Sequence, residues 1–403
     1  MATKDDLYML SVGTESNADD DTNPSLQIIK NNKIDQKINL PDKFIHAVND
    51  INNTIVWYNN TLYIGGRSLD SGKPKPYVAY LENGSFTQID IPNITGDITT
   101  ITTYNNTIYI GGVIVDSNNN NKPYVAYLKN GSFTQIKVPN KDSPGSIETM
   151  TISNNTLYIG GSSSLGRDIF AYVAFFNNDN GSFVQINIRA VNDGLSGPAL
   201  GEIYTITDYN GRLYIGGYTF DDNLEKIPYV SYYKYPDSAG QWIAEIIVDP
   251  FVGQGFIEVD TKFTTGYFYT MTIYNNRLYI CGMGNDKPYV AYLEGESLKQ
   301  IDILNNENGS INTMTIHNNT LYIGGYSFDS NNYKPYVAYL EGESFIQIEN
   351  TSDTKNKIVS LYSYNEEEDK KKENMGLIIG LILGVGLPII ILITYLFYRR
   401  IRK

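Results

Sequence analysis

Short runs of alternating hydrophobic and polar residues dominate this chain, and one run of residues returns along most of its length. One copy reads YNNTLYIGG at residues 58–66. The aligned tyrosines of the complete copies are Tyr63, Tyr109, Tyr158, Tyr214, Tyr279 and Tyr322. Their spacing varies between 43 and 65 residues, which is the period of a β-propeller blade. The alternation has a period of two and therefore predicts strands.

Each copy predicts one four-stranded antiparallel blade. In the last copy the strands are INTMTIH (311–317), TLYIGGYS (320–327), PYVAYLE (335–341) and SFIQIE (344–349). Asn-Asn or Asn-Gly pairs join the first strand to the second, and these residues accept the positive φ angles of a two-residue hairpin. Paired glycines such as Gly65 and Gly66 end the second strand, which indicates that another part of the backbone comes close there.

Both ends of the chain hold partial copies. Residues 7–41 match strands two to four without a first strand, and residues 357–367 match a first strand without its second. Joined, they make one more blade and leave no open sheet edge. We therefore expect an all-β fold over residues 1–366, a seven-bladed β-propeller whose first blade is closed by residues 357–367.

A second repeat supports the count of seven. Nine residues before the aligned tyrosine, each complete copy has a threonine: Thr54, Thr100, Thr149, Thr205, Thr270 and Thr313. The closing strand has Ser360 at the equivalent position. The next residue is aliphatic in all seven strands. We interpret the pair as a polar position beside a wet central channel, followed by an apolar position between blades. The alternative is a ring of hydroxyls that binds a ligand.

The sequence MTIHNNTLYIGG, followed by a loop and PYVAYLEGESFIQI, resembles a divergent kelch repeat. The hallmark of that family is a Gly-Gly pair after the second strand, with aromatic residues in the next two strands. The resemblance covers about residues 6–366, but the tryptophan usual in the fourth strand is mostly phenylalanine here, and only Trp242 is retained. The resemblance implies a propeller of a kind that often serves as a protein-interaction platform, and it carries no catalytic residues with it.

The C-terminal segment predicts a membrane anchor. Residues 376–398 are almost wholly apolar and long enough to cross a bilayer of roughly 30 Å as one helix. A charged stalk (367–375) precedes them and a basic tail (399–403) follows. No apolar run for a signal peptide opens the chain, so we expect a tail-anchored, single-pass protein with a cytosolic propeller. The opposite orientation stays open, because four basic residues follow the span and three lysines precede it.

Three glycines within this segment, Gly376, Gly380 and Gly384, recur at intervals of four residues. This spacing permits close contact between helices in lipid and predicts a homodimer through the membrane helix. The alternative is that glycine is simply tolerated there.

The composition limits the kinds of partner and functional site that the chain can have. The net charge of −13 argues against nucleic acid as a partner. A single cysteine, Cys281, rules out an internal disulfide and is interpreted as a small buried residue. Only His46 and His317 are available as imidazole ligands, too few for the copper or zinc sites of related folds. The chain has no Gly-x-Ser-x-Gly elbow and no phosphate-binding loop, so we expect neither an enzyme nor a cofactor.

Acidic and amide residues gather in the loops between second and third strands, as in DSNNN at 116–120. Their oxygens suit Ca²⁺, but the same residues also form turns through local hydrogen bonds. We favour the turns.

The partner-binding surface is predicted from loop lengths. In a propeller, the loops after strands two and four share one face, here called the long-loop face, and the short hairpins share the other, the tight-turn face. The longest insertions, 189–202 and 249–267, bracket blade five and contain Leu195, Phe251, Phe256 and Phe263, while a loop of blade five has Asp221 and Asp222. We expect this face to bind an unknown protein partner, as a scaffold or receptor. A glycan-binding or glycan-processing propeller is the alternative function, and packing onto their own blade is the alternative role for the apolar residues.

Overall fold

The computed structural model describes most of the propeller. The described residues are 5–13, 25–41, 44–45, 54–70, 73–91, 94–139, 143–165, 168–186, 201–220, 225–234, 257–258, 265–295, 297–303, 308–329, 332–348 and 356–363. They belong to a compact unit that spans Met1–Ser363. No helix among them is long and apolar enough to cross a membrane. The expected span at 376–398, with its three glycines, lies outside the described residues.

Seven antiparallel sheets form the unit, and each follows the predicted order of strands. The innermost strands are β29 (Asn356–Ser363), β5 (Ile55–Tyr58), β9 (Thr95–Tyr104), β13 (Gly145–Ser153), β17 (Glu202–Tyr209), β21 (Gly266–Tyr274) and β25 (Asn308–His317). The second strands are β1 (Leu7–Gly13), β6 (Thr61–Asp70), β10 (Thr107–Val115), β14 (Thr156–Leu165), β18 (Arg212–Phe220), β22 (Arg277–Gly284) and β26 (Thr320–Asp329).

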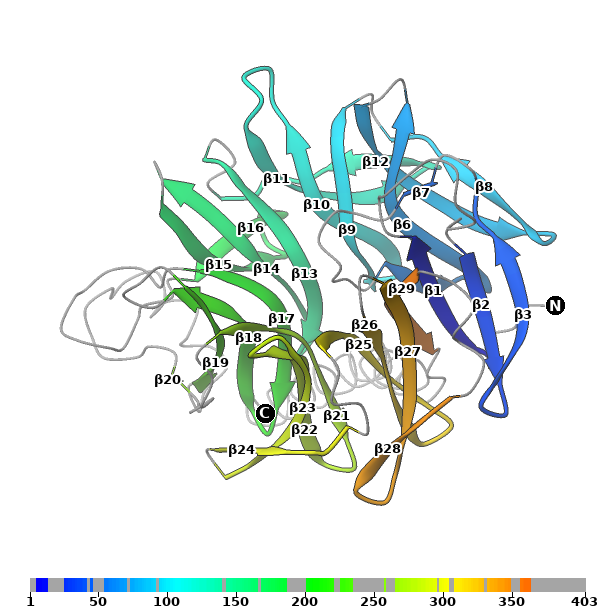
Figure 1. The fold of residues 1–403 in the computed structure, drawn as a ribbon. Helices are drawn as coiled ribbons and strands as arrows, with labels where there is room; N and C mark the ends of the chain where they lie inside the picture. The colour runs from blue at the N-terminus through cyan, green and yellow to red at the C-terminus, as the bar shows by residue number, and fades with distance from the viewer. Residues whose placement is uncertain are drawn as a thin grey trace, which may run out of the picture. The chain divides into compact units, whose positions relative to one another are not determined.

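The third strands are β2 (Ser25–Lys30), β7 (Lys73–Glu82), β11 (Asn121–Lys129), β15 (Asp168–Asn177), β19 (Lys226–Lys234), β23 (Lys287–Glu294) and β27 (Asn332–Glu341). The outer strands are β3 (Lys33–Asn39), β8 (Ser85–Ile89), β12 (Ser132–Gln135), β16 (Ser182–Ile186), β20 (Ile257–Glu258), β24 (Ser297–Gln300) and β28 (Ser344–Gln347). Figure 1 shows the innermost strands gathered around one centre, with outer strands such as β3, β8, β24 and β28 at the periphery.

The predicted closure of the ring is confirmed. Strand β29 pairs antiparallel with β1, and Ser360 lies opposite Leu10. The closing strand ends at Ser363, and residues 364–367 of the predicted strand lie outside the described part. Blade 2 differs from the expected four strands, because two short segments, β5 and β4 (Phe44–Ile45), both pair with β6.

Packing between neighbouring blades forms the hydrophobic core. Among the described residues, seven major clusters each join two adjacent blades, from blades 1 and 2 through to blades 7 and 1. The last of these places Leu361 of the closing strand against Tyr322 and Val337 of blade 7. Since burial of one large apolar side chain contributes about 1.5–3 kcal/mol, each blade depends on its neighbours for most of its stability.

The two-residue hairpins adopt the predicted geometry. Both residues of the turn have positive φ, for example Asn105 at 47° and Asn106 at 53°. The tyrosine before this turn then reaches the turn of the next blade: Tyr58, Tyr104, Tyr209 and Tyr274 donate hydrogen bonds to the carbonyl oxygens of Asn106, Asn155, Asn276 and Asn319. The tight-turn face is therefore a chain of bonds from blade to blade.

Six of the seven inner strands carry a β-bulge that the sequence pattern did not reveal. One residue stands out of register directly before the repeated hydroxyl position: Thr99, Glu148, Tyr204, Tyr269, Asn312 and Val359. The bulge explains the second glycine of each pair. A Cβ on Gly112 would overlap the carbonyl oxygen of Asp97, and one on Gly217 would overlap that of Glu202. The predicted close approach of backbone is thus confirmed and comes from the bulged strand itself.

Candidate functional site on the long-loop face

The seven inner strands have uniform and variable positions, and the difference locates the candidate site. The residue two before the hydroxyl is apolar and buried in six strands: Ile98, Ile147, Ile203, Phe268, Ile311 and Ile358. The third residue before the hydroxyl changes from blade to blade: Asp97, Ser146, Glu202, Tyr267, Ser310 and Lys357. The bulged residue varies as well. Both variable positions lie toward the start of the inner strand, which is the end nearest the long-loop face.

The uniform hydroxyl position has a structural role that differs from the one expected. Six of these side chains are buried between blades and do not line a wet channel, since Thr54 and Ser360, for example, are at most 1% exposed. The seventh, Thr270, is partly exposed. Thr205 accepts a hydrogen bond from the backbone N–H of Met271 at 3.1 Å, and Thr313 accepts one from Leu361 at 3.0 Å. The hydroxyl joins a blade to the next one because its neighbour's bulge leaves a backbone donor to satisfy.

Three carboxylates from adjacent blades come together at the variable positions. We call Asp97, Glu148 and Glu202, with Ser146, Ser162 and Arg67, the carboxylate cluster. Glu202 accepts hydrogen bonds from the hydroxyls of Ser146 at 3.0 Å and Ser162 at 2.9 Å. Its other oxygen accepts one from Tyr204 at 3.0 Å. Arg67 lies 3.8 Å from Asp97 through Nη1 and Oδ2.

Glu148 is the most unusual member. It is only 3% exposed, and its Oε2 atom has no hydrogen-bond partner. Burial, followed by the charge of Glu202, raises the pKa of Glu148 to about 8. Burial also raises the pKa of Asp97, whereas the Arg67 charge acts to lower it. The Glu148 carboxyl therefore holds a proton at neutral pH.

Aromatic rings border the cluster on the side of blades five and six. We call Tyr204, Tyr218, Phe220, Tyr267 and Tyr269 the tyrosine cluster. Tyr267 and Tyr269 stack with their ring planes 8° apart, and Tyr218 meets Tyr267 edge to face at 5.5 Å. The ammonium of Lys226 lies 4.3 Å from the centre of the Tyr218 ring and 5.3 Å from that of Tyr267. These rings can hold a cation against their faces.

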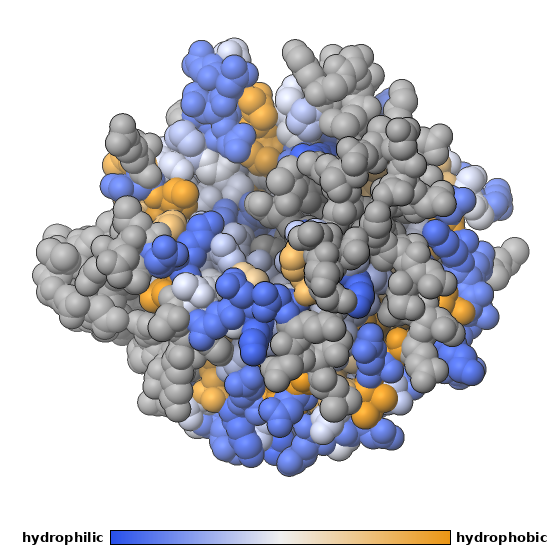
Figure 2. Space-filling view, in the orientation of Figure 1, coloured by the Kyte–Doolittle hydropathy of each residue, from blue (hydrophilic) through white to orange (hydrophobic). Residues whose placement is uncertain are grey.

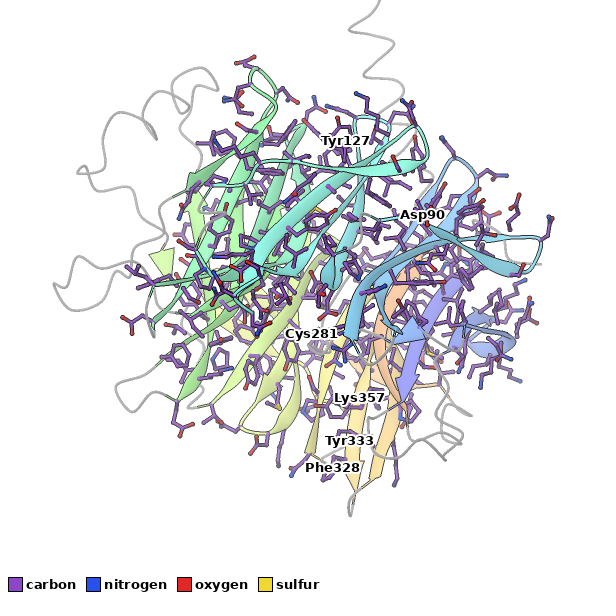
Figure 3. All side chains as sticks on the ribbon, turned by 90° about the horizontal axis from the view of Figure 1, so that it is seen from above. Asp90, Tyr127, Cys281, Phe328, Tyr333 and Lys357 are labelled. Carbon is purple, nitrogen blue, oxygen red and sulfur yellow. The ribbon has the colours of Figure 1, made fainter. Side chains whose placement is uncertain are left out.

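A second aromatic surface lies on blade 7. Lys357 lies over the rings of Tyr326 and Tyr333, at 4.7 and 4.4 Å, and Phe328 packs against Tyr333. Phe328 is one of three large hydrophobic side chains in the described part that remain exposed. Figure 3 shows Lys357 of the closing strand β29 in line with Tyr333 and Phe328 of blade 7. On the face seen in Figure 2, the coloured surface is mostly hydrophilic, and its hydrophobic residues form small separate areas.

The site residues predicted from the sequence fall elsewhere. The partner-binding candidates Leu195, Phe251, Phe256, Phe263, Asp221 and Asp222 all lie outside the described residues. The structure brings together instead Asp97, Glu148 and Glu202, which sequence reasoning missed. A signal was present: these are acidic residues on strands whose other copies carry mostly Ser, Thr, Tyr or Asn at the same positions.

Other candidates from the sequence have local explanations. The carboxylate of Asp116 accepts hydrogen bonds from the backbone N–H groups of Asn118 and Asn120, so this loop is a turn of the expected kind. His317 makes contacts at 3.0 Å to Ser363 and Asn318, and burial lowers its pKa. Cys281 is fully buried where other blades have the first glycine, as expected. No group of three or more His, Cys, Asp or Glu residues in the described part is placed to hold a metal ion.

Comparison with known proteins assigns no family to this chain. No protein-family model matches the chain, and no curated protein sequence matches it. Among solved structures, YjhT is similar with a TM-score of 0.47 and 12% identity, covering 76% of this chain and 98% of its own. Sqt1 from Chaetomium thermophilum is similar with a TM-score of 0.44 and 14% identity, covering 79% of this chain and 74% of its own.

Proposed function

We propose that this chain is a membrane-anchored β-propeller that captures a protein partner on its long-loop face. The observation that carries the proposal is the contrast along the inner strands. Positions that face neighbouring blades repeat, whereas positions toward the long-loop face differ from blade to blade and collect charged and aromatic residues. Residues that serve only the fold should repeat with the fold, so the variable residues point to recognition.

The role proposed is binding and not catalysis. The long-loop face offers polar and aromatic groups of several kinds, and these are the groups that anchor partners at protein interfaces. The kelch resemblance agrees with this role. Leu195 and Phe263 each lie between an outer strand and the next inner strand, so they belong to loops of this face and are proposed to take part. The sequence predicts the same for Phe251 and Phe256, but these two residues precede the outer strand β20, which pairs with β19, and so belong to the connection between the third and fourth strands of blade five.

Anchoring through residues 376–398 is part of the proposal, with the propeller in the cytosol and the glycines at 376, 380 and 384 joining two copies. The closing strand leads into the stalk from the tight-turn side, so the long-loop face would point away from the membrane. Protease treatment of intact membranes tests the topology, since a protected propeller would show the opposite orientation. Replacement of Gly380 by Ile should weaken the dimer in detergent.

A pull-down from membranes tests partner capture. The full chain is compared with Leu195→Ala/Phe263→Ala on the long-loop face and with Glu82→Ala on the tight-turn face. We expect a protein that is recovered with the wild type and with Glu82→Ala but lost with the double variant. Equal recovery by all three forms, with unchanged thermal unfolding, would contradict the proposal.

A glycan-binding role is the second candidate, and the aromatic surface of blade 7 favours it. Tyr333 and Phe328 present ring faces beside the Lys357 ammonium, a combination that can stack on a sugar ring and bind an acidic group. A glycan array with the wild type and Tyr333→Ala separates the two functions. Binding to a defined glycan that Tyr333→Ala abolishes would favour this second function.

A further inference from the structure

We propose that the carboxylate cluster and the tyrosine cluster together bind one organic cation, a primary ammonium or a guanidinium, presented at the long-loop face. The binding of the cation stands on the structure alone. That the cation belongs to a side chain of a partner rests on the function proposed above.

The first argument is charge. The three carboxylates come from three adjacent blades, and Arg67 lies 3.8 Å from Asp97 through Nη1 and Oδ2. Even with a proton on Glu148, Asp97 and Glu202 leave the cluster with more negative than positive charge. Buried carboxylates so arranged favour a further cation, because a low-dielectric surrounding strengthens the attraction.

The second argument is an unfilled place for a donor. In blade 3 the bulged Thr99 donates a hydrogen bond to the carbonyl oxygen of Ile147 in the next blade, and in blade 7 Asn312 donates to Ile358 at 3.4 Å. Blade 4 has Glu148 at this position, and its Oε2 atom makes no hydrogen bond to the next blade. Its Oε2 atom and the Oδ1 atom of Asp97 are both buried without a hydrogen-bond partner. Two acceptors without a donor mark a place where a donor binds.

The third argument is the kind of cation. Tyr204 and Tyr218 both donate hydrogen bonds to Glu202, so the tyrosine cluster directly contacts the carboxylate cluster. Rings do not ligate a hard metal ion, but they hold ammonium and guanidinium groups by cation–π attraction. Lys226 already places an ammonium over Tyr218 and Tyr267, which shows that these rings accept one.

The fourth argument is access. Glu202, Tyr267 and Tyr269 are partly exposed, while Glu148 is buried. A long, thin group such as a lysine side chain suits this arrangement, because its stem can lie on the rings while its head reaches the carboxylates.

Binding should release a proton. Before a cation binds, Glu148 of the carboxylate cluster holds a proton at neutral pH. A cation beside this carboxyl favours its ionised form. The other charged groups around the site are Arg67, Asp97 and Glu202 beside the carboxyls, with Lys226, Glu225 and Asp286 around the rings. Binding should therefore tighten as pH rises from 6.5 to 8.5.

Calorimetry with the full chain in detergent tests the inference, with butylammonium and butylguanidinium as probes and butanol as the neutral control. Titrations at pH 7 in two buffers of different ionisation enthalpy measure the proton released. We expect at least one of the two cations to bind with release of most of one proton, and butanol not to bind. Glu148→Gln should weaken binding about tenfold or more and abolish the release, since loss of a charged hydrogen bond costs about 1.5–3 kcal/mol.

The matched control is Glu294→Gln, which removes an exposed carboxylate in a hairpin of blade 6 and should leave binding unchanged. Asp97→Asn is the second variant in case Glu148→Gln unfolds, and it should weaken binding as well. Unchanged affinity in a folded Glu148→Gln, binding without proton release, or equal binding of butanol would overturn the inference.

The same variants test the cation site and the capture of a protein partner separately. If butylammonium binds as expected and the pull-down recovers no partner, the site stands and the scaffold function fails. If a partner is captured equally by the wild type and Glu148→Gln, the scaffold function stands and the cation does not come from that partner.

Discussion

At the scale of single residues, Glu148 shows how one side chain departs from its structural equivalents. Thr99 and Asn312 stand at the same bulge and use their donors to reach the next blade. Glu148 makes no such bond through its Oε2 atom, which is buried without a hydrogen-bond partner. A proton removes the charge of this buried carboxyl, at the cost of a stability that depends on pH.

The pH dependence of stability follows from the raised pKa of Glu148. The folded state holds a proton that the unfolded state loses near pH 4.5, so stability falls as pH rises toward 8. Glu148→Gln keeps the shape without the titration. We expect its melting temperature to change less than that of the wild type between pH 6.5 and 8.5, and to exceed it at pH 8.5.

Between pH 6.5 and 8.5, His317 and Cys281 contribute little to the pH dependence of stability. The lowered pKa of His317 acts below about pH 6.5, where its ordinary value lies, and the raised pKa of Cys281 acts from about pH 9 upward. Thermal unfolding of both forms at pH 6.5, 7.5 and 8.5 is the measurement. Parallel melting curves across the window would show that Glu148 does not hold a proton.

At the scale of elements, the unit that repeats is the bulged inner hairpin. The bulge brings the carbonyl oxygen of the inner strand against the second glycine, while the first glycine faces side chains of the next blade. A side chain added at the second glycine would meet backbone atoms, which cannot move aside, whereas one at the first glycine would meet side chains, which can. Blade 6 shows the difference, because Cys281 occupies the first position and Gly282 keeps the second.

Two substitutions in blade 6 test this account against each other. Cys281→Ala shortens a buried side chain and should cost about 1 kcal/mol. Gly282→Ala adds a Cβ that overlaps the carbonyl oxygen of Tyr267, so the cost should reach about 2–3 kcal/mol. Denaturant unfolding of the two variants measures both, and equal costs would mean that the bulge is not a constraint.

The hairpin turns carry a second element of the repeat. Tyr58 and Tyr209 each donate a hydrogen bond to the turn of the next blade, at 2.7 and 2.8 Å. Phenylalanine at either position should cost about 0.5–1 kcal/mol, and the double variant should cost the sum because the two sites lie in separate blades. Tyr127→Phe is the control, since Tyr127 contributes a stacked ring against Tyr109. Equal losses in the control and the single variants would assign the effect to the rings.

At the scale of the molecule, the sequence predicted the architecture but not the site. Six complete copies of one pattern specify six blades, and the partial copies at the two ends specify the seventh, with the closure that β29 and β1 make. Asp97, Glu148 and Glu202 lie about fifty residues apart in sequence, and only the ring brings them together. The bulge escaped detection because its residue type differs among most blades, so that no single repeated residue marks it.

The closing strand provides the last prediction. Leu361 is 2% exposed, packs between blades 7 and 1, and donates its N–H to Thr313 of blade 7. Proline at this position removes that donor and the buried side chain together, so the ring should open where β29 meets β1 and blade 7. We expect Leu361→Pro to aggregate in size-exclusion chromatography and to be cleaved by protease near both ends of the propeller, because it exposes the edge of β1. Leu361→Met keeps volume and N–H and should stay close to wild type. A soluble, protease-resistant Leu361→Pro would show that the other six interfaces hold the ring without its closure.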